Sequence, residues 1–137
     1  MAVAKPIVPE ELQHLIARFI LFCREETLLL DGVDLKKTRV TAKKGGLTLQ
    51  LPYVDRHRRP VLLDVTQQQD RWLLSDGGRI LAGCRGRLCQ AYLRHVLRWY
   101  GLARRDGALI LETSAAGFAG KLYTFIRVLR TIDYLIQ

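Results

Sequence analysis

The sequence predicts a single α+β domain, in which an N-terminal helix precedes a small antiparallel sheet and two helices with a hairpin between them follow it. Three observations lead to this fold class. Apolar residues recur at helical spacing near both ends of the chain, three short central stretches have the composition of strands, and short polar connections join those stretches. The length of 137 residues suits one domain, and we find no repeat or linker that would divide it.

The first predicted element is an amphipathic helix that begins at Pro9 and ends near Arg24 or Glu25. Proline suits a first helical position, and the two glutamates that follow it suit the positive end of the helix dipole. Residues 1–8 are expected to be loose. The apolar stripe of this helix consists of Leu12, Leu15, Ile16, Phe19, Ile20, Phe22 and Cys23.

The central part of the chain predicts three strands. Residues 33–46 are polar and basic, which indicates a loop or an edge strand. Residues 47–51 alternate between apolar and polar side chains, as a half-buried strand does, and we expect Pro52 to end this strand. Residues 61–65 and 71–75 predict two further strands, and the short connections favour an antiparallel meander.

The C-terminal part predicts a helix over residues 87–100, with Gly101 as the residue that ends it. An Asp-Gly pair within residues 103–113 favours a hairpin with a two-residue turn. A last helix is expected over residues 115–135. Its apolar seam should pack into the core, and a homodimer interface is the alternative to a monomer. The seam consists of Phe118, Leu122, Phe125, Leu129, Ile132 and Ile136.

Two short motifs resemble those of a bacterial and phage family catalogued as domain of unknown function 1828. Residues 52–57 read Pro-Tyr-Val-Asp-Arg-His, and residues 74–78 read Leu-Ser-Asp-Gly-Gly. The family has a Pro-aromatic-aliphatic-Asp-Arg-His turn between two strands, then an Asp-Asp-Gly turn, and finally the helix, hairpin and long helix expected here. This chain departs from that pattern at Arg58-Arg59 and at Gly77, and both changes remove acidic character. The resemblance implies a phage or mobile-element setting, and it implies no activity.

The formal net charge of +9 is concentrated in two basic blocks. Residues 36–59 hold eight basic residues against one acidic residue, and residues 79–105 hold seven arginines and no acid. Of the 22 basic residues 16 are arginine, whose planar guanidinium binds phosphate or carboxylate with two hydrogen bonds. A mixed-sign surface would suffice for solubility, so the blocks predict a nucleic acid as partner, with an acidic protein as the alternative.

The chain is expected to be cytoplasmic and not to cross a membrane. Its longest apolar run is five residues, whereas a spanning helix needs about 20, and no leader sequence opens the chain.

The strongest candidate interface lies on the predicted helix over residues 87–100. Arg87, Arg94 and Arg98 fall within about 40° of one another at ~100° per residue, so they should form one exposed ridge. A flanking face is expected to anchor this helix to the core through Leu88, Tyr92, Val96 and Trp99. The further arginines expected to contact the partner are Arg79, Arg85, Arg104, Arg105, Arg56, Arg58 and Arg59.

We expect this binding to be non-catalytic and to need no cofactor or metal. If the partner is a protein, we expect an inhibitor that binds a host defence complex and blocks it sterically, much as anti-CRISPR proteins do. A second alternative is a metal-dependent nuclease whose carboxylates would be Asp55, Asp64 and Asp76, because such enzymes hold Mg²⁺ with converging acidic side chains. Against the nuclease, turn aspartates usually bond nearby backbone N–H groups, and Asp64 can pair with an arginine.

The three cysteines are an odd number, and without a leader we expect reduced thiols that are buried or half-buried. A zinc site at Cys84, Cys89 and His95 is not expected. On a helix Cys89 and His95 would diverge by about 120°, and structural zinc needs four ligands.

Overall fold

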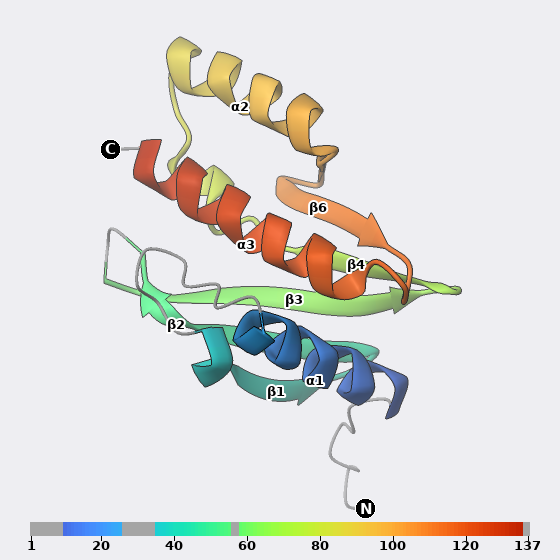
Figure 1. Cartoon of the computed structure of the whole chain (residues 1–137). Helices are drawn as coiled ribbons and strands as arrows, with labels where there is room; N and C mark the ends of the chain where they lie inside the picture. Colours follow the sequence, from blue (N-terminus) through green and yellow to red (C-terminus); the bar gives the residue numbers. More distant parts are fainter. Residues whose placement is uncertain (1–9, 26–34, 56–57, 136–137) are drawn as a thin grey trace, which may run out of the picture.

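The computed structural model describes residues 10–25, 35–55 and 58–135, and it confirms the α+β class, with one helix before the sheet and two helices late in the chain (Figure 1). In chain order the elements are α1 (Glu10–Glu25), the 3₁₀ helix η1 (Leu35–Lys37), β1 (Arg39–Lys43), β2 (Gly46–Val54), β3 (Pro60–Gln68), β4 (Arg71–Ser75), the 3₁₀ helix η2 (Leu81–Gly83), α2 (Arg87–Tyr100), β5 (Ala103–Arg105), β6 (Ala108–Thr113) and α3 (Phe118–Leu135).

The strands of the described residues form one antiparallel sheet in the order β1-β2-β3-β4-β6-β5. The predicted meander is confirmed for β2 to β4, and the basic stretch before it contains the edge strand β1. The predicted hairpin is confirmed by the pairing of β5 with β6. It also extends the sheet, because β6 pairs with β4 from Trp72 opposite Thr113 to Ser75 opposite Ile110.

Two strand boundaries differ from the prediction. We expected β2 to end at Pro52, but it continues to Val54. Proline lacks the N–H that a strand donates to its neighbour, but Pro52 lies where β2 is not regularly paired, so no such hydrogen bond is lost. The pairing of β1 with β2 reaches only to Gln50, and the pairing of β2 with β3 is irregular between Gln50 and Val54. β3 is also longer than predicted, at Pro60–Gln68.

The turn residues behave as their types predict. Asp106 and Gly107 both have positive φ, 52° and 76°, as a two-residue type I′ hairpin turn requires. Gly101 ends α2 in the left-handed conformation, with φ of 72°, and its N–H donates to the carbonyl of Leu97.

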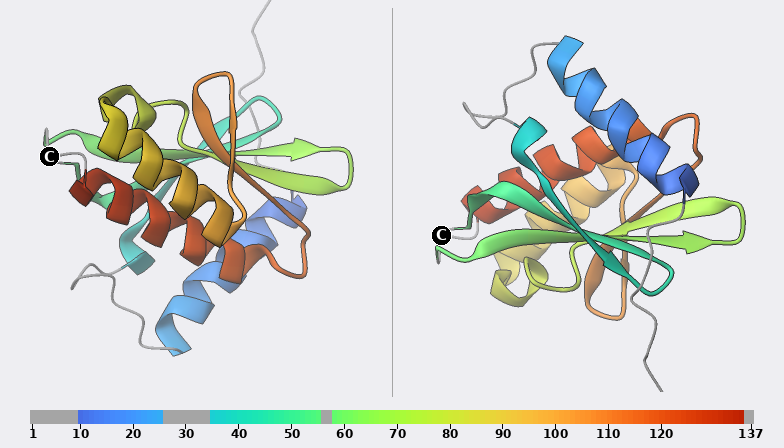
Figure 2. Two further views of the ribbon diagram at one scale, coloured as in Figure 1. Left: turned by 90° about the horizontal axis from the view of Figure 1, so that it is seen from above. Right: turned by 90° about the horizontal axis from the view of Figure 1, so that it is seen from below.

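The core lies between the sheet and the two helices α1 and α3, which contact each other and cross at a large angle (Figure 2). Figure 2 shows α2 on the other flank of α3, away from α1. The predicted seam of α3 is buried from Phe118 to Ile132, which confirms its core role, whereas Ile136, like residues 1–9, lies outside the described residues. α3 begins at Phe118 and not at residue 115, because residues 114–117 form a turn in which the N–H of Gly117 donates to Ser114 Oγ.

Candidate nucleic-acid interface

The predicted arginine ridge exists as an exposed surface of α2. Arg87, Arg94 and Arg98 are all exposed, and within the described part of the chain none of them forms an ion pair or a side-chain hydrogen bond. We call these three residues the arginine ridge. Their guanidinium groups are therefore available to phosphate or carboxylate groups of a partner.

The residues that hold α2 in place lie on a different face of the helix from the arginine ridge. Leu93, Val96 and Leu97 are buried and pack into the core, while no side chain caps the N-terminus, where Gly86 has φ of 88°. Because this buried face is narrow, most of the circumference of α2 is left to solvent.

The predicted anchoring face of α2 was mostly wrong. Val96 is buried, but Leu88, Tyr92 and Trp99 are 88%, 44% and 74% exposed. At ~100° per residue these three residues and His95 fall within about 60° of one another, whereas the buried residues lie further round the helix. We call Leu88, Tyr92, His95 and Trp99 the aromatic stripe.

The aromatic stripe borders the arginine ridge, and together they cover roughly 160° of the helix surface. The rings of His95 and Trp99 stack, with 6.2 Å between their centroids and 29° between their planes. One exposed helix face thus presents free guanidinium groups beside flat aromatic rings. Large apolar side chains gathered on a surface in this way are typical of interaction sites.

A second group of the predicted arginines gathers away from α2. Arg59, Arg79 and Arg85 line one pocket, although they come from both basic blocks of the sequence. Arg79 is mainly structural. Its Nη1 donates to the carbonyls of Leu62 and Asp76, and its Nη2 lies 3.7 Å from Asp64 Oδ2.

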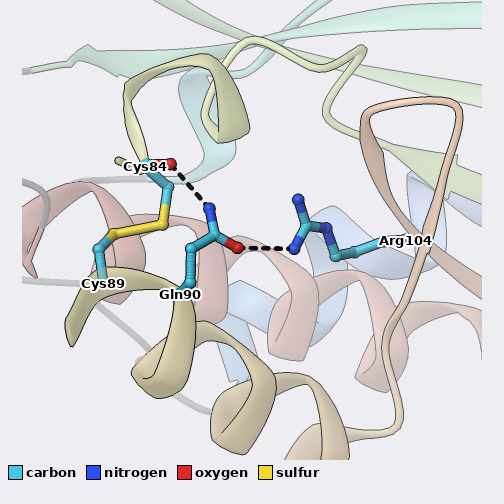
Figure 3. The surroundings of a disulfide bond; sticks show 4 residues. All are labelled: Cys84, Cys89, Gln90 and Arg104. Atoms are coloured by element: carbon cyan, nitrogen blue, oxygen red, sulfur yellow. Dashed lines mark hydrogen bonds between the residues drawn. A yellow bond between two sulfur atoms is a disulfide. The ribbon is translucent and has the colours of Figure 1, made fainter. Parts of the chain in front are cut away.

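The remaining predicted arginines are dispersed. Arg58 and Arg105 are exposed, and Arg56 lies outside the described residues, as does His57 of the family-like motif. Arg104 of β5 donates to Gln90 Oε1 at 2.9 Å, and Gln90 in turn donates to the carbonyl of Cys84 (Figure 3). Arg104 thus helps to fix the start of α2 against the sheet.

The expectation of free thiols was wrong for two of the cysteines. Cys84 and Cys89 are joined by a disulfide, with 5.8 Å between their Cα atoms (Figure 3). Cys84 is buried and Cys89 is half-buried, as expected. The chain bends at Gly86 before α2 starts, and this bend brings Cys84 back over the first helical turn. The loop that the disulfide closes contains Arg85 and Arg87, so the bond holds Arg85 close to the first turn of α2, to which Arg87 belongs.

The three aspartates of the nuclease alternative all have structural partners. Asp76 is 1% exposed, and its carboxylate accepts hydrogen bonds from the N–H groups of Gly78, Ile80 and Leu109. Asp64 accepts from Thr48 Oγ1, and Lys43 and Arg79 lie within ion-pair distance of it.

Asp55 closes the turn between β2 and β3, because it accepts from the N–H of Arg59 and pairs with that side chain. Asp55 and Asp76 thus bond nearby backbone groups, and Asp64 pairs with an arginine, which confirms the structural interpretation of each. Within the described ranges, no three His, Cys, Asp or Glu side chains are grouped as metal ligands would be.

The described helices include none long and apolar enough to cross a membrane. Comparisons of the chain with protein-family models, with curated proteins and with solved structures find no match. The resemblance to domain-of-unknown-function family 1828 therefore stays a prediction.

Proposed function

We propose that the protein is a non-catalytic nucleic-acid-binding protein of a phage or mobile element, and that it binds through the exposed face of α2. The observation that carries the proposal is the arginine ridge, whose three side chains are exposed and unpaired within the described structure. Neutralising a phosphate releases condensed counterions, which makes such a ridge a favourable site for a nucleic-acid backbone.

The aromatic stripe favours an unpaired strand over a duplex. Proteins that bind single strands combine a cationic track for the backbone with aromatic rings on which bases stack, and each stacked base contributes about 1–3 kcal/mol. Trp99 and Tyr92 offer such rings beside the ridge, whereas paired bases in a duplex keep their faces stacked on one another.

A second candidate function is the inhibition of an acidic protein, such as a host defence complex. Leu88 is the observation in its favour, because this side chain is 88% exposed and an aliphatic group offers no ring on which bases can stack. Protein interfaces also favour tryptophan, tyrosine and arginine at their energetic centres.

The test is a salt series of fluorescence-anisotropy titrations with labelled single-stranded DNA, single-stranded RNA and duplex DNA. One variant carries Arg87→Gln, Arg94→Gln and Arg98→Gln. The control carries Arg18→Gln, Arg39→Gln and Lys121→Gln, three exposed cationic side chains outside α2 that form no ion pair within the described structure. Both variants lose the same net charge, so only the position of that charge differs.

We expect the ridge variant to bind single strands roughly 100-fold more weakly at 0.1 M salt, and its salt slope to fall by about 2, since each lost phosphate contact removes ~0.7. The control should keep the slope of the unmodified protein. Equal losses in the two variants would show that only net charge matters, and they would contradict a defined interface. No binding to any nucleic acid, together with capture of an acidic host protein that depends on Leu88, would favour the inhibitor.

A further inference from the structure

The pocket that Arg59, Arg79 and Arg85 line lies beside an edge of the sheet that no strand covers among the described residues. β3 pairs with β4 only from Asp64 to Gln68, whereas in the described structure its first residues, 60–63, pair with β2 alone. The chain leaves β4 at Asp76 and passes alongside this free edge, where Arg79 donates to the carbonyl of Leu62. A pocket of about 870 Å³ remains between the edge, residues 79–85 and the last turns of α3.

Three polar groups of this pocket lack partners within the described structure. The hydroxyl of Tyr53 is buried and makes no hydrogen bond to any described residue, which is costly for a polar group. Arg85 and Asp133 form no ion pair among the described residues, although they carry opposite charges and line the same space. By contrast, Arg59 and Arg79 already pair with Asp55 and Asp64.

Tyr53 contributes to the wall of the pocket. Burial raises the pKa of its phenol, the Arg130 guanidinium, 4.5 Å from the ring centre, opposes this shift, and the nearby Asp133 carboxylate reinforces it. The phenol is protonated at neutral pH even at its ordinary pKa, so Tyr53 is neutral, and its hydroxyl is sealed from solvent, so a ligand in the pocket does not reach it.

The other walls are apolar. Val61, Leu62, Ile80 and Leu129 line the pocket, and together they suit the faces of a planar ring. A volume of this size lies in the range that drug-sized ligands occupy, and a simple anion or a free amino acid would leave most of it empty.

We propose that this pocket binds a nucleoside monophosphate group, with the phosphate at Arg85 and the base between the apolar walls. Such a ligand is bipolar, as the unpaired groups require. Its phosphate accepts from the guanidinium, and a base amino group can donate to Asp133. An inorganic anion would leave Asp133 unsatisfied.

The same chemistry has two sources: a free nucleotide, and the 5′-phosphorylated end of a strand. Arg85 precedes the first residue of the arginine ridge, Arg87, by two positions within the disulfide loop, so a strand bound along α2 has its end within reach of this region. The proposal does not depend on strand binding, because it stands on the pocket alone.

The experiment is isothermal titration calorimetry of the full chain with AMP, GMP, CMP and UMP, and with inorganic phosphate and adenosine as partial ligands. Amide chemical-shift mapping by NMR locates each binding event. Short oligonucleotides with a 5′ phosphate or a 5′ hydroxyl distinguish the two sources. The pocket variants are Arg85→Gln and Asp133→Asn, and the matched control is Arg39→Gln, an exposed arginine on β1 outside the pocket.

We expect one nucleotide to bind per chain and to shift the amides of Leu62 and Ile80. Arg85→Gln should weaken this binding about 10- to 100-fold, since it removes a charged hydrogen-bond partner, and Asp133→Asn, which exchanges an acceptor for an amide, about 3- to 10-fold. The control should bind as the unmodified chain does. Binding of the 5′-phosphorylated oligonucleotide alone, with the same losses in both pocket variants, would assign the site to a strand end.

The proposal is overturned if neither nucleotides nor strand ends bind. It is also overturned if inorganic phosphate binds as tightly as the best nucleotide, or if the shifted amides lie on α2 and not at the pocket. The double variant Arg94→Gln/Arg98→Gln separates the two sites. It should lose strand affinity and keep mononucleotide affinity, so failure of the ridge does not affect the pocket.

Discussion

Asp76 is predicted to be a structural anchor whose loss unfolds the sheet around it. Asp76→Ala removes the acceptors of three backbone N–H groups, those of Gly78, Ile80 and Leu109. The bond to Leu109 is buried and joins the end of β4 to β6, whereas the other two are partly buried and can gain water.

The magnitude follows from these three bonds. An orphaned buried donor costs about 1–3 kcal/mol, and a partly hydrated donor costs about 1 kcal/mol, so we expect a loss of roughly 3–5 kcal/mol in the free energy of unfolding. A small domain has about 5–15 kcal/mol in total, so the variant should be marginally stable. Asp76→Asn should lower the free energy of unfolding by less, because its amide oxygen can still accept from the N–H groups of Gly78 and Leu109. Only the N–H of Ile80 then loses its acceptor, since an NH₂ group cannot accept.

The assay is urea denaturation followed by circular dichroism and by the fluorescence of Trp72, which is 1% exposed. The control is Asp70→Ala in the exposed turn between β3 and β4, which should change the free energy of unfolding by no more than about 0.5 kcal/mol. An Asp76→Ala protein as stable as the control would refute the reasoning. If that protein also lost a Mg²⁺-dependent cleavage activity, Asp76 would be a catalytic ligand and the nuclease alternative would replace our proposal.

Two further predictions concern the disulfide and catalysis. Replacing Cys84 and Cys89 together with serine should lower the free energy of unfolding by about 2 kcal/mol, because the bond closes a short loop with a sequence separation of 5. Thiol titration of the unmodified protein under denaturing conditions should find one free thiol, that of Cys23, and three free thiols would contradict the bond. The purified protein should not cleave single- or double-stranded DNA or RNA with Mg²⁺ or Mn²⁺, because Asp55, Asp64 and Asp76 are held by structural partners. Cleavage that disappears in Asp64→Ala would show that this inference is wrong.

Elements with local signals could be predicted from the amino-acid sequence. Gly101 ends α2, and the Asp106-Gly107 pair forms the hairpin turn, because the backbone preferences of these residues act within one turn of chain. The alignment of Arg87, Arg94 and Arg98 also followed from the sequence, since helical geometry alone sets the angle between them.

The face that each element turns to the core depends on how the elements pack together. Trp99 and Leu88 have the spacing of core residues, yet α2 buries the neighbouring stripe at Leu93 and Leu97. Helical periodicity shows that apolar residues share a side, and it does not show where α3 will lie. The end of β2 also depended on the neighbouring strands. Pro52 can lie within β2 because neither β1 nor β3 pairs regularly with it at that position.

The pocket and the disulfide depended on the tertiary structure for the same reason. Arg59 and Arg85 belong to separate basic blocks, and they line one pocket because β4 turns away from β3 at Asp76. Cys84 and Cys89 meet because the chain bends at Gly86, which a continuous helix would not allow. Local preferences fix the elements over a few residues, whereas burial and the proximity of distant residues arise only when those elements pack together.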